Sequence, residues 1–268
     1  MKKLLFTLLA AAPVLFASCT NQFNAAYLLS GGMKTAQALS LSDEQIQSYV
    51  GQYVQQLDAQ NPVLPETSPY VKRLRNMTRG ITQVDGIPLN FKVYKTDNVN
   101  AFACADGSVR IYSGLMDIMT DDELLGVVGH EIGHVALKHT KKQFKQALLT
   151  SAVRDALVSA GGHVATLSAS ELGSLGEALA GASFSRKQEN QADDFGYDFL
   201  KAAGRNPWAM AMAFEKLERL SRGSDTGDTP AAQSSAAAGI FSSHPDTATR
   251  IQRMSDRATA DGYKKPMK

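Results

Sequence analysis

The stretch at residues 129–134 reads GHEIGH and combines two histidines with a carboxylate. On an α-helix, residues four apart project from the same face, so His130 and His134 can offer two imidazole nitrogens to one ion. Zinc is bound by such nitrogens at about 2.0–2.1 Å. Glu131 follows the first histidine directly and can reach a water molecule on that ion. This H-E-x-x-H spacing predicts a zinc site with Glu131 as the general base.

Two histidines on a helix face can also have ordinary hydrogen-bonding roles, either in solvent or in a core. The helix around the motif is apolar on much of its surface, at Leu124, Leu125, Val127, Val128, Ile132 and Val135. Burying two imidazoles and a carboxylate there without a ligand would be costly. Gly129 and Gly133 also leave room for backbone or substrate to come close. The metal site is therefore the preferred interpretation.

A catalytic zinc usually has three protein ligands and one open position. His139 follows the second histidine by five residues and lies on a different helix face. Leu137 and Thr140 stand where the metzincin extension needs glycine and histidine, which excludes that class. A later segment, SRKQENQADD, carries Glu189 and Asp193 four residues apart. One carboxylate can bind zinc while the other holds a ligand imidazole, although an acidic helix face alone is usually just solvated.

The sequence pattern around these residues predicts one mostly helical α+β domain over residues 42–260, with a small antiparallel β-sheet. Capping boxes, in which Ser or Thr precedes Glu or Gln by three residues, predict helix starts at Ser42, Thr120 and Ser185. Apolar periodicity and turn residues predict the remaining elements. They are helices at 70–81, from Asn206 to Leu220 and after SSHPDTATR, strands at 89–95 and on both sides of Asp106-Gly107, and a flexible loop at 221–239.

Residues 1–18 have the features of a lipoprotein signal peptide. A basic start and an apolar run too short to span a membrane precede small residues and Cys19. This context resembles a bacterial lipobox, in which the cysteine is lipidated and becomes the new N-terminus. Thr20 is not the aspartate of inner-membrane retention, so we expect a lipid anchor in the outer membrane, facing the periplasm. Residues 19–41 would form a tether. Ordinary cleavage near Ala17, giving a free secreted protein, is the alternative.

The charge is nearly balanced, with 28 Lys and Arg against 26 Asp and Glu, and both signs are interspersed. Nucleic-acid binding needs a clustered basic excess, so no nucleic-acid partner is expected. The chain has two cysteines, and lipidation of Cys19 would leave Cys104 without a partner. We therefore expect no disulfide framework and interpret Cys104 as a small buried residue.

Four motifs together resemble a known family: HEIGH, the later SRKQENQAD, the preceding NAFACADGSVRIYSGL and the following SHPDTATRI. They are similar to the gluzincin metalloproteases of the HtpX and CAAX prenyl endopeptidase type, and within it to the LoiP-like outer-membrane lipoprotein metalloproteases. The resemblance implies a zincin-like domain that binds one Zn2+ per chain through His130, His134 and Glu189. It also implies Glu131 as the catalytic base and Asp193 as the group that orients a ligand imidazole.

The expected function is that of a zinc-dependent endopeptidase in which Glu131 activates a zinc-bound water to hydrolyse peptide bonds. By resemblance, the substrates are damaged or misassembled cell-envelope proteins, and other envelope proteases or assembly factors are candidate partners. HtpX-type relatives carry membrane helices near the catalytic domain. No apolar run here is long enough to supply them, so their membrane-embedded role is not expected. The alternative is an envelope chaperone or assembly factor with a zinc site and little proteolysis.

His244, in SHPDTATRI, is the candidate for a second donor to the oxyanion that develops during hydrolysis. Pro245 would stiffen its backbone, and Arg250 could brace the turn. A second hypothesis places His244 in the open zinc position of the resting enzyme, with residues 221–244 as a movable segment over the cleft. A surface histidine at a helix start is the simpler alternative.

The strand NAFAC, residues 100–104, is expected to border the cleft. Proteases commonly hold a substrate as an added strand along an exposed sheet edge. Asn100 and Phe102 are therefore candidate substrate-binding residues, and ordinary sheet packing is an equally good account of both.

Overall fold

The structure, a computed structural model, describes residues 41–151, 153, 157, 160, 163–225, 244 and 247–267. The predicted signal peptide, the predicted lipidation site Cys19 and the tether up to residue 40 lie outside the described residues. Of the predicted loop, residues 221–225 continue a helix, and residues 226–239 lie outside the described part.

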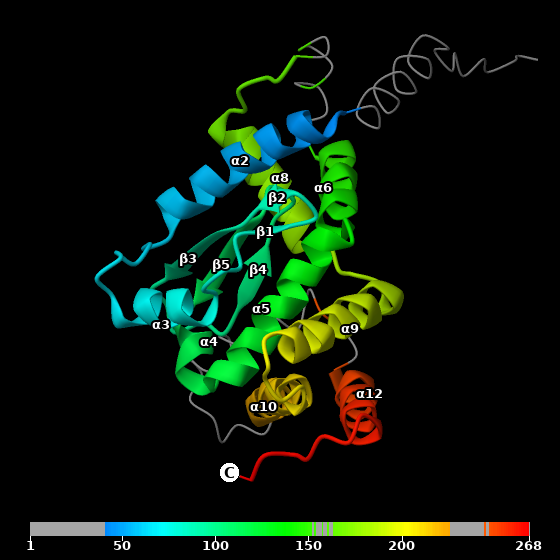
Figure 1. The fold of residues 1–268 in the computed structure, drawn as a ribbon. Helices are drawn as coiled ribbons and strands as arrows, with labels where there is room; N and C mark the ends of the chain where they lie inside the picture. The colour runs from blue at the N-terminus through cyan, green and yellow to red at the C-terminus, as the bar shows by residue number, and fades with distance from the viewer. Residues whose placement is uncertain are drawn as a thin grey trace, which may run out of the picture.

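Helices surround a small sheet, which confirms the predicted α+β class (Figure 1). The helices are α2 (Asp43–Gln60), α3 (Pro69–Met77), α4 (Ser113–Ile118), α5 (Asp121–Ala136), α6 (His139–Thr150), α8 (Ala169–Ala180), α9 (Arg186–Ala202), α10 (Trp208–Asp225) and α12 (Thr247–Ala260). The strands are β1 (Gln83–Val84), β2 (Ile87–Pro88), β3 (Asn90–Tyr94), β4 (Ala101–Ala103) and β5 (Ser108–Tyr112). Among the described residues, no helix is both long enough and apolar enough to span a bilayer.

The capping boxes predicted at Ser42, Thr120 and Ser185 are all present. Each hydroxyl accepts a hydrogen bond from the backbone N–H three residues later. The Gln or Glu at that later position accepts one from the N–H of the capping residue. A cap of this kind stabilises a helix by about 0.5–2 kcal/mol. Thus α5 and α9, which carry the predicted chemistry, begin where the sequence indicates.

The three-stranded sheet has the order β3–β5–β4, and β4 lies at the edge nearest α5 (Figure 1). β4 and β5 pair antiparallel across the Asp106-Gly107 turn, as predicted. Gly107 takes a φ of +85°, a region that glycine enters without a steric penalty. β3 pairs with β5 in parallel, so the sheet is mixed rather than wholly antiparallel.

Glycine allows α5 and α9 to approach closely. A Cβ atom at Gly196 of α9 would lie 3.0 Å from the backbone nitrogen of His130. One at Gly129 of α5 would lie 2.8 Å from the ring of Phe199, and the space at Gly133 is likewise filled by α9. The space beside the glycines of α5 is therefore filled by residues of α9 rather than by substrate. This contact brings the first turn of α9 to the two histidines of α5.

The buried apolar side chains of the described residues form two clusters. The larger cluster fills the space between the sheet, α5, α9, α10 and α12. The second lies among α2, α6 and α8. The chain passes from α5 to α6 through Lys138, which has a left-handed φ of 60°. The histidine motif therefore lies near the junction of the two clusters.

Candidate metal centre

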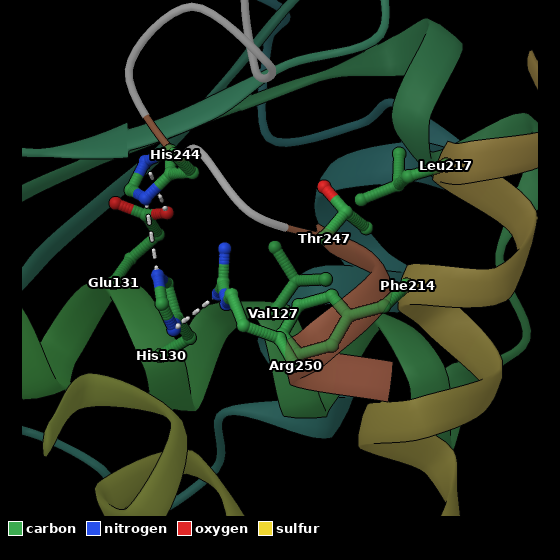
Figure 2. Close-up of a pocket in the computed structure, with 8 residues that line it drawn as sticks. All are labelled: Val127, His130, Glu131, Phe214, Leu217, His244, Thr247 and Arg250. Carbon is green, nitrogen blue, oxygen red and sulfur yellow. Dashed lines mark hydrogen bonds and ion pairs between the residues drawn. The ribbon is translucent and has the colours of Figure 1, made fainter. Parts of the chain in front are cut away.

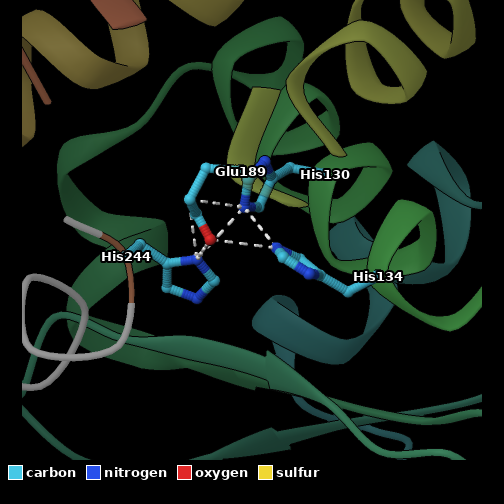
Figure 3. A group of neighbouring side chains, drawn as sticks. All are labelled: His130, His134, Glu189 and His244. Atoms are coloured by element: carbon cyan, nitrogen blue, oxygen red, sulfur yellow. Dashed lines mark hydrogen bonds and ion pairs between the residues drawn. The ribbon is translucent and has the colours of Figure 1, made fainter. Parts of the chain in front are cut away.

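Four buried side chains meet at one point: His130 and His134 of α5, Glu189 of α9, and His244 (Figure 3). Their candidate ligand atoms all lie within 4.8 Å of one another. Nε2 of His130 lies 3.1 Å from Nε2 of His134, which in turn lies 3.4 Å from Oε1 of Glu189. Nδ1 of His244 lies 3.2 Å from Nε2 of His130 and 3.1 Å from Oε1 of Glu189.

These separations fit a tetrahedral zinc site. Ligand atoms about 2.0–2.1 Å from one ion, at tetrahedral angles, are about 3.3 Å apart. The donor set of imidazole nitrogens and a carboxylate oxygen is also one that zinc prefers. Three of these residues are ligands expected from the sequence, and one of the two hypotheses for His244 puts it in the fourth position. The structure places His244 beside the other three.

His130 is held from behind by Asp193, whose Oδ1 lies 2.9 Å from Nδ1 of His130. Arg250 of α12 donates from Nη2 and Nε to the two oxygens of Asp193, at 2.6 and 2.9 Å. Its Nη1 lies 2.7 Å from Oε2 of Glu189. The ring of Phe214 covers the guanidinium at 4.3 Å. Arg250, a candidate brace for the turn near His244, thus pairs with two buried carboxylates.

His134 has different neighbours. Its Nδ1 lies 3.2 Å from Nδ1 of His139, which is itself buried. The ring of Phe184 stacks on His134 with centroids 3.8 Å apart. His139 is not among the four converging ligand atoms, in keeping with its different helix face. Sequence reasoning missed this contact, although the need of a zinc-bound imidazole for a partner at its other nitrogen could have pointed to it.

Glu131 is buried beside the cluster, with 3% of its surface exposed. Its Oε1 has no hydrogen-bond partner among the described residues and lies 3.6 Å from Nε2 of His244. Burial raises the pKa of Glu131 above its ordinary value, and His244 and His130 partly offset that effect. A carboxylate with a raised pKa and a free oxygen is suited to accepting a proton.

Electrostatics keep His134 and Glu189 in the forms that bind a metal. His244 differs: burial opposes its protonation, but Glu131 and Glu189 raise its pKa above the ordinary value. Burial lowers the pKa of His134 well below its ordinary value, so the imidazole is neutral. Burial would raise the pKa of Glu189, but hydrogen bonds with His134 and His244 hold that pKa far below its ordinary range. Burial likewise opposes ionisation of Asp193, yet Arg250 lowers its pKa to about 2. Metal binding requires such deprotonated ligands.

A small pocket lies beside these groups, lined by Val127, His130, Glu131, Phe214, Leu217, His244, Thr247 and Arg250 (Figure 2). Its volume of about 20 Å³ is enough for a water molecule. Phe214 and Leu217 of α10 lie across from Glu131 and His244 (Figure 2). The pocket therefore lies between an apolar wall and a carboxylate oxygen that has no hydrogen bond among the described residues.

The candidate substrate-binding residues have contacts within the sheet. Oδ1 of Asn100 accepts a hydrogen bond of 2.9 Å from the N–H of Ala101. The ring of Phe102 packs with those of Tyr94 and Tyr112, at centroid distances of 6.3 and 6.4 Å. Neither side chain belongs to the four-residue cluster. These are sheet-packing contacts, the alternative that the sequence left open.

Known proteins resemble the chain over most of its length. A model of peptidase family M48 matches residues 71–258. Metalloprotease LoiP of Escherichia coli (strain K12) is 45% identical over 238 residues, which are 88% of this chain and 90% of LoiP. Metalloprotease YcaL of the same organism is 37% identical over 252 residues, covering 93% and 94% of the two chains.

A beta-barrel assembly-enhancing protease of Yersinia pestis is 28% identical over 229 residues. The match covers 82% of this chain and 47% of that relative, so the chain spans about half of its length. The family match includes the H-E-x-x-H helix and Glu189, two of the elements that build the buried cluster. The chain therefore belongs to peptidase family M48 and is a zinc metalloendopeptidase.

Proposed function

We propose that this enzyme hydrolyses peptide bonds in damaged or misassembled cell-envelope proteins, with Glu131 as the general base. His130, His134 and Glu189 would hold the zinc ion. The observation that carries the proposal is the free, buried Oε1 of Glu131 beside the convergent ligand atoms. A buried carboxylate oxygen without a partner costs free energy unless water or substrate uses it.

When bound, zinc supplies a Lewis acid that polarises a carbonyl and lowers the pKa of water towards about 7. Glu131 accepts a proton from the attacking water and delivers it to the leaving amine. Asp193 accepts the Nδ1 proton of His130 and so fixes its ring orientation. Arg250 pairs with both Glu189 and Asp193 and so offsets one of their two buried negative charges.

His244 has two candidate roles, and we propose that the observed arrangement is the closed, resting one. Its Nδ1 completes a set of four protein ligands, whereas a catalytic zinc site keeps one position open. Its Nε2 faces Glu131 at 3.6 Å, where a substrate would have to meet the base. His244 must therefore move away before a substrate binds. A role of His244 as a donor to the oxyanion would require the ring to turn back towards the bound substrate after this movement.

The geometry around Glu131 also suggests how a peptide is held. Within the described residues, β4 is paired with β5 alone, and the backbone of Ala103 hydrogen-bonds Glu131. An extended substrate that pairs with the outer edge of β4 would run past the catalytic carboxylate. The pocket walled by Phe214 and Leu217 would lie beside this path and, at about 20 Å³, admits a water molecule rather than a side chain. In this arrangement the outer edge presents the backbone of Ala101 and Ala103, because the carbonyl of Asn100 accepts a hydrogen bond from the N–H of Tyr112 and Phe102 pairs with Arg110 of β5.

The cellular part of the proposal rests on the first 20 residues and on the relatives. A lipid on Cys19 would hold the enzyme at the outer membrane, facing the periplasm, with protein or peptide substrates. One group of relatives is named for enhancing β-barrel assembly, which supports an envelope role. The same name favours the second candidate function, that of an envelope chaperone or assembly factor with a zinc site and little proteolysis. Envelope proteases or assembly factors as partners would suit both functions.

Glu131→Gln tests the proposal because the amide keeps the size of the side chain and removes the base. We expect casein hydrolysis to fall roughly 100- to 10,000-fold, while zinc content and fold stay unchanged. Wild-type enzyme treated with a chelator is the control for zinc dependence. Loss of cellular function together with cleavage supports the protease. Full cellular function in a variant that cannot cleave contradicts it and favours the assembly factor.

A further inference from the structure

His139 is a buried histidine to which the catalytic proposal gives no role. It is the first residue of α6 and is 3% exposed. Its Nδ1 lies 3.2 Å from Nδ1 of His134, and the two rings meet edge to face with centroids 5.2 Å apart. A hydrogen bond between two ring nitrogens needs one donor and one acceptor, so the protonation of the pair is constrained.

The other nitrogen of His134 gives the direction of this hydrogen bond. Its Nε2 faces Nε2 of His130 and Oε1 of Glu189, at 3.1 and 3.4 Å, which is the side of the proposed ion. A neutral imidazole that uses the Nε2 lone pair for a metal carries its proton on Nδ1. His134 therefore donates and Nδ1 of His139 accepts. His139 then carries its proton on Nε2, and the side chain of Gln191 hydrogen-bonds its ring.

Backbone and packing hold the His139 ring in this place. Lys138, with its left-handed φ of 60°, separates α5 from α6 and sets His139 at the start of the new helix. Phe184 stacks on His134 at an interplanar angle of 26°, and its centroid lies 6.4 Å from that of His139. The two imidazoles are thus shielded from water. In such a buried environment a hydrogen bond is stronger than at the protein surface.

We propose that His139 is a positioning residue for the metal: it accepts the Nδ1 proton of His134 and thereby aims Nε2 of His134 at zinc. Asp193 makes the matching contact with His130, so each imidazole of the motif has its own anchor. Removing such an anchor typically weakens metal binding roughly 10- to 100-fold. The inference rests on the proposed function only in taking His134 as a zinc ligand, and it does not depend on proteolysis.

The test measures zinc affinity by competition with a chromophoric chelator, in full-length protein that carries Glu131→Gln. Failure of the catalytic proposal then leaves the result unaffected. His139→Phe keeps a planar ring and removes the acceptor, whereas His139→Asn places an amide oxygen near the position of Nδ1. We expect the Phe variant to bind zinc roughly 10- to 100-fold more weakly and the Asn variant to recover most of the loss. His163→Asn, at an exposed histidine, is the matched control.

Two further measurements separate positioning from a general loss of structure. Thermal unfolding in chelator reports the stability of each metal-free variant, and it should not follow the order of zinc affinities. In the zinc-loaded protein, long-range proton–nitrogen NMR should place the proton of His139 on Nε2. Wild-type affinity in the Phe variant overturns the inference, as does an Asn variant as weak as the Phe variant. If His134→Ala also binds zinc normally, the ligand assignment itself is wrong.

Discussion

Nδ1 of His244 lies 3.1 Å from Oε1 of Glu189, the same distance that separates Nε2 of His130 from Nε2 of His134. His244, which is 55 residues from Glu189 in the chain, thus lies as close to a neighbouring ligand atom as the two histidines of the motif lie to each other. On its other side, the ring faces Glu131. His244 therefore stands between the metal position and the base.

His244→Ala should raise the basal activity of the enzyme on a quenched fluorescent peptide. If the open arrangement is populated about one time in ten, removing the closing ligand increases kcat/KM by up to about tenfold. Zinc affinity should fall at the same time, because one of four ligand atoms is lost. Activity is compared at saturating zinc, with metal content measured on the same samples. A lower kcat at full zinc content would contradict the closed state and support the oxyanion role.

Gly196→Ala should push α9 away from α5. The added Cβ would lie 3.0 Å from the backbone nitrogen of His130, and a backbone atom cannot move aside as a side chain can. We expect a loss of about 1–3 kcal/mol in the free energy of unfolding, measured with denaturant, and weaker zinc binding. Gly173→Ala in α8 is the control, because its Cβ would meet nothing within 4 Å. That substitution should stabilise the protein by about 0.5–1 kcal/mol. Equal effects of both changes would contradict the packing argument.

Arg250→Met removes the guanidinium that pairs with both Asp193 and Glu189. Breaking a buried ion pair from one side leaves uncompensated charge, so we expect a destabilisation of about 3–5 kcal/mol in chelator. Zinc should restore part of this loss, because the ion neutralises Glu189. Unfolding is measured by denaturant titration with and without zinc.

The matched control is Arg253→Met, on the same helix α12. Arg253 pairs with Asp194 of α9, but both side chains are partly exposed, at 31% and 41%. Such surface pairs contribute about 0–1 kcal/mol. If Arg250→Met costs no more than this control, the buried network does not have the stabilising role assigned to it.

The sequence predicts the local parts of the site well because they depend on neighbours along the chain. Capping boxes at Thr120 and Ser185 give the starts of α5 and α9, and helical spacing puts His130 and His134 on one face. Glu189 was found only because a catalytic metal needs a third ligand, which is a chemical requirement rather than a local signal. The structure then supplies the glycine contacts that bring it to the histidines.

The contacts that sequence reasoning missed are those between distant segments. Arg250 and Asp193 are 57 residues apart in the chain, and no local sequence pattern predicts that they pair. The contact between His139 and His134 depends on the left-handed turn at Lys138, a conformation that lysine rarely takes. The parallel pairing of β3 with β5 likewise depends on tertiary contacts, because turn residues indicate only how strands adjacent in the sequence pair.

Asp58 of α2 joins that helix to the sheet. Its carboxylate accepts hydrogen bonds from Nε of Arg110, at 2.8 Å, and from Lys92 and the hydroxyl of Tyr94, at 2.8 and 2.7 Å. Partial burial would raise the pKa of Asp58, but these donors outweigh it and lower the pKa to about 2. Asp58 is therefore more readily ionised in the folded protein than in the unfolded chain.

A carboxylate with a depressed folded pKa stabilises the protein above its unfolded pKa and loses that contribution as pH falls through the folded value. For Asp58 the window runs from an ordinary value of 3.8 down to about 2. We expect Asp58→Asn to be less stable than wild type at neutral pH and to lose less stability across this window. Denaturant unfolding at each pH, in chelator so that zinc release does not contribute, measures the difference. Glu66→Gln, which breaks an exposed pair with Arg75, should leave the curve nearly unchanged. Parallel curves for wild type and Asp58→Asn would show that these contacts do not depress the pKa of Asp58.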